Sequence, residues 1–135
     1  MLDVRPSPIA GTWYEGNAKT LARSVDEYLN NAQLPELDGE VVAVIAPHAG
    51  HRYSGAVAGY AFAALRSAST TGFGEERLSP PLSASKLVAV ISPFHNLARY
   101  PLITTAHDAY GTPLGNIAVD KAALAELSSH LDIPI

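Results

Sequence analysis

The sequence predicts an α/β fold with a mostly parallel sheet flanked by helices, on two kinds of observation. Continuous apolar runs at residues 41–46 and 87–92 are typical of strands that are covered on both faces. Apolar side chains recur at helical spacing within residues 17–33, 56–67 and 120–131. Strand-like and helix-like segments therefore alternate along the chain, which is the pattern of an α/β domain.

The first elements are an arm and a helix. Residues 1–16 are rich in proline and glycine and predict an irregular arm, which the bulky Trp13 and Tyr14 anchor against the domain. A helix is predicted over residues 17–33, because Asn17 is a suitable N-cap and apolar residues follow it at helical spacing. The apolar face of this helix consists of Leu21, Val25, Tyr28 and Leu29.

The middle of the chain predicts a strand, a turn and a second helix. Residues 41–46 are the first strand, and a turn rich in glycine and histidine follows over residues 47–55. Residues 56–67 predict a helix with almost no charge, whose small side chains permit close approach to a sheet. Serine, threonine, glycine, proline and glutamate dominate residues 68–85, which predict a surface connection.

The last part of the chain predicts two strands and a third helix. Residues 87–92 are the second strand and residues 101–106 a third, while glycine and proline indicate turns within residues 108–119. The third helix is predicted over residues 120–131, and it begins at Asp120.

The predicted sheet is incomplete. Two or three central strands are few for a sheet that is covered on both faces. The chain of 135 residues also ends on an apolar stretch, residues 131–135, that resembles the start of a further strand. We therefore expect residues 1–135 to be the N-terminal part of a single α/β domain.

Composition argues against several classes of protein. The chain is 47% hydrophobic and 16% charged, with a formal net charge of −4, which is ordinary for a folded globular protein. It has no basic stripe, which argues against nucleic-acid binding, and no cysteine, which excludes disulfides and thiolate ligands within it. No apolar run reaches the ~18 residues of a membrane span, and the N-terminus lacks a signal-peptide pattern, so a cytoplasmic location is expected.

Two histidines occupy equivalent places in the predicted fold. His48 follows the apolar run 41–46 after a proline, and His95 follows the run 87–92 after a proline and a phenylalanine. Ligands collect outside the carboxyl ends of strands in open α/β sheets, so both imidazoles are candidate metal ligands or acid–base groups. The alternative is that both rings are hydrogen-bonded to loop backbone and have no further role.

Other polar residues are weaker candidates for a functional site. His51 lies three residues after His48 on a predicted turn, which is not the H-E-x-x-H helix spacing of zinc proteases. Ser54 is a candidate site-lining hydroxyl, although serine is also common at turns for local hydrogen bonding. His107 lies beside Asp108, but adjacent residues on a strand point to opposite faces. No nucleophile-elbow, phosphate-loop or dinucleotide-binding motif is present.

Four motifs, in order, resemble those of the Memo family, which in bacteria and archaea is often called AmmeMemoRadiSam system protein B. Residues 10–14, AGTWY, are similar to the family's A-G-x-W-Y opening, and residues 46–55 resemble its A-P-H-A-G-x-x-Y-S-G motif. Residues 92–96, SPFHN, resemble G-P-x-H-H, and residues 108–115 resemble D-x-Y-x-T-P-L-G. The resemblance spans nearly the whole chain but covers only about the N-terminal half of a family member.

The resemblance implies a fold similar to that of class III extradiol dioxygenases, which are non-haem iron enzymes. It places His48 and His95 on the two histidines of the family's metal site, and it implies iron or copper as the metal and redox chemistry in the full-length context. It also suggests AMMECR-type and radical-SAM proteins as partners. Asn96 replaces the family's second consecutive histidine and Ser92 its glycine. The family's third site residue has no counterpart here, and two histidines alone would bind a metal weakly.

Three hypotheses follow. In the first, His48 and His95 are the metal-binding and catalytic part of a Memo-family site, with His51, Ser54 and Asn96 as ligand-binding residues along its cleft. In the second, the same cleft belongs to a non-catalytic binding or scaffold module and receives a peptide or a partner protein. In the third, the chain is a truncated product without independent activity, and its incomplete sheet edge would cause it to oligomerise or aggregate.

Overall fold

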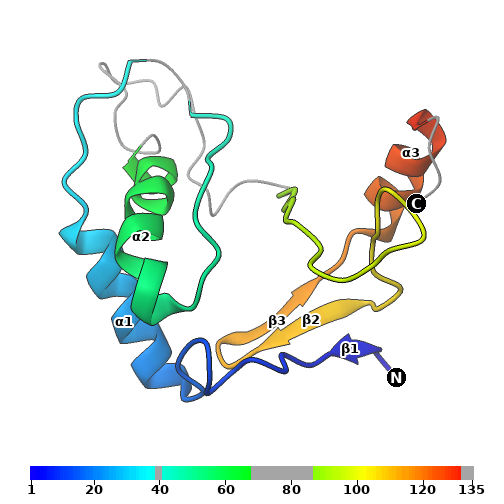
Figure 1. Cartoon of the computed structure of the whole chain (residues 1–135), viewed down its shortest axis with the longest axis horizontal. Helices are drawn as coiled ribbons and strands as arrows, with labels where there is room; N and C mark the ends of the chain where they lie inside the picture. The colour runs from blue at the N-terminus through cyan, green and yellow to red at the C-terminus, as the bar shows by residue number, and fades with distance from the viewer. Residues whose placement is uncertain (39–40, 68–86, 132–135) are drawn as a thin grey trace. The chain divides into compact units, whose positions relative to one another are not determined.

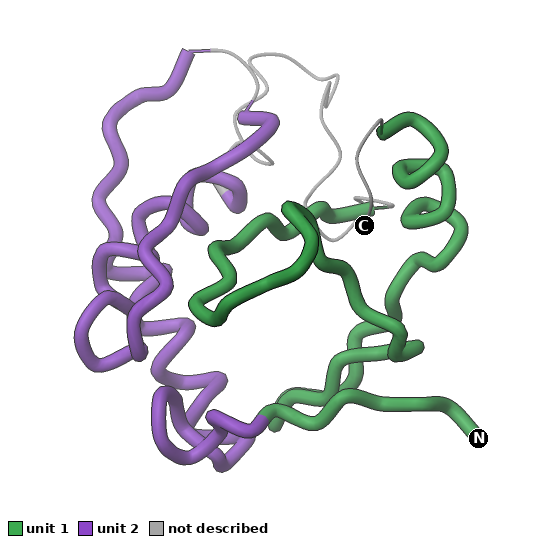
Figure 2. The backbone as a smooth tube through the Cα atoms, turned by 45° about the vertical axis from the view of Figure 1, so that its right-hand side comes forward, with its two compact units in different colours: residues 1–7, 87–135 green, residues 8–86 purple. Residues whose placement is uncertain are grey.

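The structure, a computed structural model, describes residues 1–38, 41–67 and 87–131. Residues 1–7 and 87–135 form one compact unit, called unit 1, and residues 8–86 form unit 2 (Figure 2). The elements in chain order are β1 (Val4–Arg5), α1 (Ala18–Asn31), α2 (His51–Ser67), β2 (Ala109–Thr112), β3 (Gly115–Ala118) and α3 (Lys121–His130) (Figure 1).

The described residues form a small α/β protein with a three-stranded mixed sheet and three helices. The α/β class is confirmed, but the sheet is not mostly parallel, since β1 pairs parallel with β2 while β2 pairs antiparallel with β3. No helix within the described ranges has the length and apolar character that crossing a membrane requires.

Helix α1 of unit 2 begins where the sequence predicts. The side-chain oxygen of Asn17 accepts hydrogen bonds from the backbone N–H groups of Lys19 at 3.0 Å and Thr20 at 3.2 Å. These bonds satisfy two of the N–H groups that a helix start leaves without a partner. Leu21 lies on the inner face of the helix and is only 4% exposed. The predicted helix over residues 17–33 is therefore confirmed, with an end at Asn31.

Helix α2 begins at His51 rather than at residue 56, so part of the predicted turn is helical. The backbone N–H of His51 donates to the carbonyl oxygen of Trp13 at 2.8 Å. The N–H groups of Tyr53 and Ser54 both donate to the carbonyl oxygen of Gly50, at 2.8 and 3.2 Å. The earlier start of α2 depends on this carbonyl acceptor from the loop of residues 9–14. The loop is distant in sequence, so the residues around His51 do not predict the contact.

Helices α1 and α2 approach each other closely at two glycines of α2. A Cβ atom on Gly59 would lie 2.6 Å from the carbonyl oxygen of Tyr28, and one on Gly55 would lie 2.5 Å from a ring carbon of Tyr28. The Tyr28 hydroxyl also donates to the carbonyl oxygen of His51 at 3.1 Å. The small side chains of α2 do permit a close approach, but the element that approaches is a helix and not a sheet.

The sheet of unit 1 is built around a tight hairpin. The turn between β2 and β3 uses Thr112, whose hydroxyl donates to the carbonyl oxygen of Gly115 at 2.9 Å and accepts from the N–H of Leu114 at 3.1 Å. Gly115 has a φ of +126°, which a glycine adopts without strain. The turn chemistry predicted within residues 108–119 therefore joins two strands that the sequence analysis did not predict.

The N-terminal strand is attached to the start of β2 by reciprocal contacts. The N–H of Asp3 donates to the Asp108 carboxylate at 2.9 Å, and the N–H of Asp108 donates to the carbonyl oxygen of Asp3 at 2.8 Å. The imidazole of His107 lies 3.0 Å from the Asp3 carboxylate, so its partner is Asp3 and not the adjacent Asp108. The predicted arm thus contributes a strand to the sheet at Val4–Arg5.

The third predicted helix is confirmed. Helix α3 spans Lys121–His130, and the carboxylate of Asp120 caps it by accepting from the N–H of Ala123 at 2.9 Å.

The strands predicted at residues 41–46, 87–92 and 101–106 are wrong, because none of these residues is in a strand. Their apolar side chains are largely exposed, reaching 99% for Ile45 and 91% for Ile91. An apolar run indicates a tendency to be buried, but a strand also requires a backbone partner for its hydrogen bonds. The predicted surface connection at residues 68–85 lies outside the described residues, as do residues 39–40 and 132–135.

Candidate functional site

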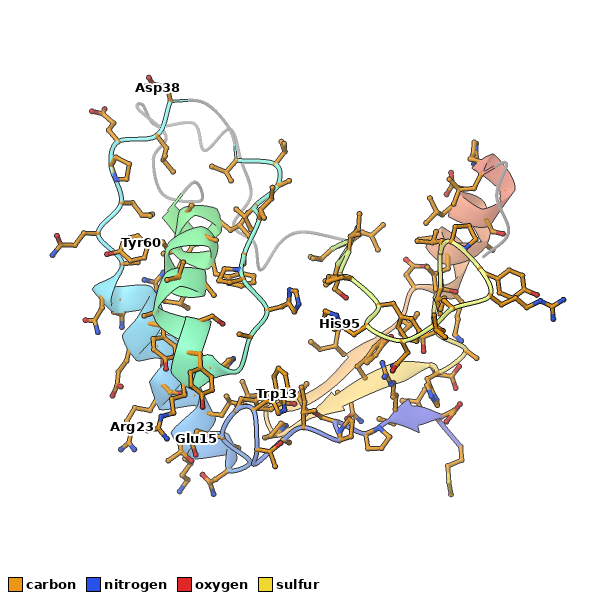
Figure 3. All side chains as sticks on the ribbon, in the orientation of Figure 1. Trp13, Glu15, Arg23, Asp38, Tyr60 and His95 are labelled. Atoms are coloured by element: carbon orange, nitrogen blue, oxygen red, sulfur yellow. The ribbon has the colours of Figure 1, made fainter. Side chains whose placement is uncertain are left out.

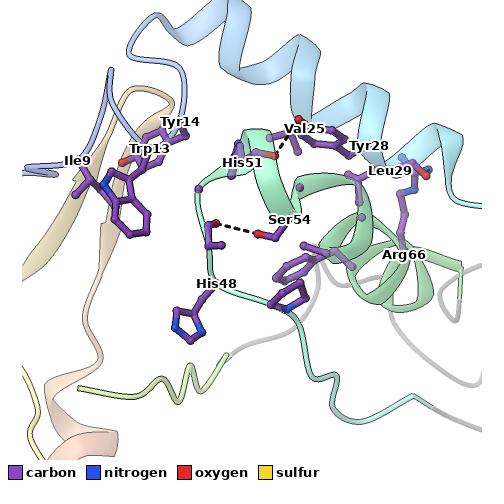
Figure 4. Close-up of a pocket in the computed structure, with 17 residues that line it drawn as sticks. Ile9, Trp13, Tyr14, Val25, Tyr28, Leu29, His48, His51, Ser54 and Arg66 are labelled. Atoms are coloured by element: carbon purple, nitrogen blue, oxygen red, sulfur yellow. Dashed lines mark hydrogen bonds between the residues drawn. The ribbon is translucent and has the colours of Figure 1, made fainter. Parts of the chain in front are cut away.

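Unit 2 contains an open pocket of about 720 Å³ (Figure 4). This volume falls within the range of small-molecule sites, roughly 300–1,000 Å³. The walls come from the 9–14 loop, from α1, from the segment before α2 and from α2 itself, and most of the side chains are apolar or aromatic. The described lining residues are Ile9, Trp13, Tyr14, Val25, Tyr28, Leu29, Pro47, His48, Ala49, Gly50, His51, Ser54, Gly55, Ala58, Gly59, Phe62 and Arg66.

Three of the predicted site residues line this pocket. His48 is exposed and lies on the irregular segment before α2, while His51 and Ser54 lie in the first turn of α2. Ser54 is 8% exposed, and its hydroxyl donates to the carbonyl oxygen of Ala49 at 2.9 Å (Figure 4). This bond ties the segment that carries His48 to the helix, so the two histidines belong to one local structure.

The ring of His51 is enclosed by tyrosines. Its centroid lies 5.6 Å from that of Tyr14 and 6.2 Å from that of Tyr28, and it meets the Tyr28 ring edge-on at 88°. Its Nδ1 atom is buried, and it is unpaired within the described part of the chain. Buried polar atoms are rarely left without a partner, so this nitrogen is a feature of the wall that needs an explanation.

His95 and Asn96 belong to unit 1, on the exposed irregular segment that precedes β2 (Figure 3). Neither lines the pocket of unit 2, whose described lining comes entirely from residues 9–66. The structure thus groups His48, His51 and Ser54 around one pocket and describes His95 and Asn96 separately. Whether His48 and His95 act on the same ligand stays a prediction.

The permanent charge on the described pocket lining comes from Arg66, a residue that the sequence analysis missed. Its Nη2 atom donates to the carbonyl oxygen of Leu29 at 3.1 Å and to the side-chain oxygen of Asn30 at 3.0 Å, at the end of α1. The sequence did indicate which face of α2 carries Arg66. One face of the helix is marked by residues at helical spacing, namely Gly55, Gly59, Phe62 and Arg66.

The described residues do not fit a metal centre by themselves. Among them, no group of three or more histidine, aspartate or glutamate side chains is placed to hold a metal ion. The described pocket lining has two histidines and no carboxylate, whereas a non-haem iron site uses two histidines and a carboxylate. No metal-dependent step follows from this arrangement.

Comparison with known proteins identifies the family. The sequence model of the Memo-like protein family matches residues 5–134. The chain belongs to the Memo-like family. Its relatives include a MEMO1 family protein of Pyrobaculum aerophilum, 29% identical over 94% of this chain and 42% of the relative. The memo-1 homologue of Caenorhabditis elegans is 34% identical over 96% of this chain and 33% of its own length.

A MEMO1 family protein of Saccharomyces cerevisiae is 28% identical over 88% of this chain and 31% of its own length. This Memo-like chain therefore spans between about a third and two fifths of the length of these three relatives. Its second family-like motif, residues 46–55, supplies a large part of the pocket wall, from Pro47 to His51 and again at Ser54 and Gly55.

Proposed function

We propose that this Memo-family chain binds a small ligand in the pocket of unit 2, with His48, His51 and Ser54 as ligand-binding residues. The observation that carries the proposal is that the family-like motif at residues 46–55 forms much of the wall of a ligand-sized pocket. Apolar walls with a few fixed polar groups are the usual composition of small-molecule sites. Ser54 and the enclosed His51 ring are held in place by their own contacts, which favours a site formed before the ligand arrives.

The test uses a neutral fluorescent probe, N-phenyl-1-naphthylamine, and the intrinsic fluorescence of Trp13. Trp13 is the only tryptophan of the chain and lies on the pocket wall, so energy transfer from it reports binding at this place. We expect saturable energy transfer in the wild-type protein and its loss in Ala58→Phe, which fills the pocket. Ala56→Phe is the matched control, because Ala56 lies on the same helix but is exposed and not part of the pocket lining.

The outcomes of this titration separate clearly. Loss of transfer in Ala58→Phe but not in Ala56→Phe supports the proposal, provided that both variants melt at a similar temperature. Equal transfer in all three proteins means that the probe binds the exposed apolar segments instead, and it overturns the proposal. In His48→Ala we expect weaker binding with an unchanged melting temperature.

A second candidate function is metal binding, with His48 and His95 as ligands of iron or copper in a longer protein that supplies the remaining ligands. It is supported by the equivalent placement of the two histidines after apolar runs and by the resemblance of their motifs to the family's. We expect a full-length protein to bind one Cu²⁺ or Fe²⁺ and to lose it in both His48→Ala and His95→Ala. His130→Ala, on α3, is the control. Metal that stays bound in both variants would exclude these ligands.

Four further proposals rest on the sequence and on the family resemblance alone. They are a dioxygenase-like fold for the complete domain, a redox activity of that domain, partnership with AMMECR-type and radical-SAM proteins, and a cytoplasmic location. A non-catalytic scaffold that receives a peptide in the same cleft is the alternative to redox activity. Co-purification of the full-length protein with the two partners tests the partnership.

A further inference from the structure

We propose that the pocket of unit 2 binds an elongated apolar molecule that ends in a carboxylate, with its chain along α2 and its carboxylate near Arg66. This inference rests on the proposed function, since it names the class of ligand for the same pocket. Three features of the described lining support it: its charge, its shape along the helix and the geometry of the arginine.

The charge of the lining favours an anion over a cation. The described lining residues include Arg66 and no aspartate or glutamate, although the whole chain carries a net charge of −4. A cationic ligand would therefore be repelled by the positive charge of Arg66. The described lining also offers it no carboxylate to replace the water that it loses on binding. An anionic group beside Arg66 gains a charge-assisted hydrogen bond instead.

The distribution of the lining along α2 favours a long ligand. The residues of α2 on the wall begin at His51 and end at Arg66, and they recur once or twice in each helical turn between these two. They form a single stripe of about 22 Å along the helix, at 1.5 Å per residue. Most of this stripe is glycine, alanine or phenylalanine, and it has its permanent charge at one end. An apolar chain with a single charged end matches that pattern.

Hydrogen bonds to the end of α1 hold the guanidinium of Arg66 in place. Two of its donated bonds come from Nη2 and go to Leu29 and Asn30, at the end of α1. These bonds orient the planar guanidinium, and its Nε and Nη1 atoms carry three more N–H groups. An oriented guanidinium binds a carboxylate with two parallel hydrogen bonds, whereas a lysine would offer only a point charge.

The experiment compares three ligands of equal chain length as competitors of N-phenyl-1-naphthylamine on the wild-type chain. Dodecanoate, dodecanol and dodecylammonium are used below their micelle concentrations. We expect dodecanoate to displace the probe at a concentration at least tenfold lower than dodecanol, and dodecylammonium to be the weakest. In Arg66→Gln this preference should be lost, so that dodecanoate and dodecanol displace the probe at similar concentrations.

Arg52→Gln is the matched control, because Arg52 lies on the same helix, is exposed and does not line the pocket. It should keep the tenfold preference. Equal displacement by dodecanoate and dodecanol on the wild-type protein overturns the inference and leaves the proposed function standing. A probe that never enters the pocket overturns both. The comparison of ligands on the wild-type protein decides the question even if Arg66→Gln weakens the fold.

Discussion

Helices α1 and α2 and the two apolar runs at residues 41–46 and 87–92 were all predicted from apolar side chains in the sequence, but only the helices form in the structure. Both helices form, although α2 begins earlier than predicted, and they pack through Tyr28 against Gly55 and Gly59. The runs carry side chains as apolar as any in the chain, yet they form no strand and remain exposed. A helix satisfies its own backbone hydrogen bonds, whereas a strand depends on a partner, so apolar character alone produces structure only in the first case.

The largest change in stability is expected for Leu21→Ala, in the packed face of α1. Leu21 is 4% exposed, and loss of its buried side chain should lower the free energy of unfolding by about 2–3 kcal/mol. Urea unfolding followed by the fluorescence of Trp13 measures the change within unit 2. Leu97→Ala is the control, because Leu97 is fully exposed and its loss should change the free energy by less than about 0.5 kcal/mol.

The next effect concerns the contact between the two helices. Gly59→Ala places a methyl group 2.6 Å from the carbonyl oxygen of Tyr28, and we expect a loss of about 1–2 kcal/mol after the gain in helix propensity. Gly55→Ala should cost less, because its new methyl group meets the side chain of Tyr28, whereas that of Gly59→Ala meets backbone. The same urea titration compares the two variants. A Gly59→Ala protein more stable than wild type would contradict this packing.

A smaller effect is expected at the start of α1. Asn17→Ala removes the acceptor for two backbone N–H groups and should cost about 1 kcal/mol. Asn17→Asp should retain most of the stability, because a carboxylate caps the helix in the same way. Thermal unfolding followed by circular dichroism is sufficient here. Asn31→Ala, at the other end of α1, provides a matched control outside the cap.

The smallest effect is expected within the apolar runs. Ile45 is 99% exposed, so Ile45→Thr should change the free energy of unfolding by less than about 0.5 kcal/mol. The measurement is again urea unfolding of unit 2. A loss above about 1.5 kcal/mol would show that Ile45 is buried in solution, and the contrast with the helices would then disappear.

The sequence predicted the helical part of the fold well and the sheet poorly. Asn17 and Asp120 were correctly expected at helix starts, since the bonds of a cap reach only two or three residues along the chain. Strand β1 was missed because its partner lies far along the chain, with Asp3 and Asp108 separated by 105 residues. No local pattern around Val4–Arg5 indicates such a partner.

The candidate site was predicted in part. His48, His51 and Ser54 follow from the motif at residues 46–55, and all three line the pocket. The role of Arg66 was missed, because it follows from the end of α1, which positions the guanidinium through Leu29. Trp13 was expected only as an anchor of the arm, yet it also forms pocket wall and accepts the first hydrogen bond of α2.

The sequence by itself determined the presence of three helices, the N-caps of α1 and α3, the turn chemistry of the hairpin, the absence of thiolate ligands and the family. Each of these depends on neighbours within a few residues or on the order of motifs. Only the tertiary structure decided where α2 begins, which strand pairs with the N-terminal segment and which side chains meet at the pocket. Those features depend on contacts between residues distant in the chain, and only folding brings such residues together.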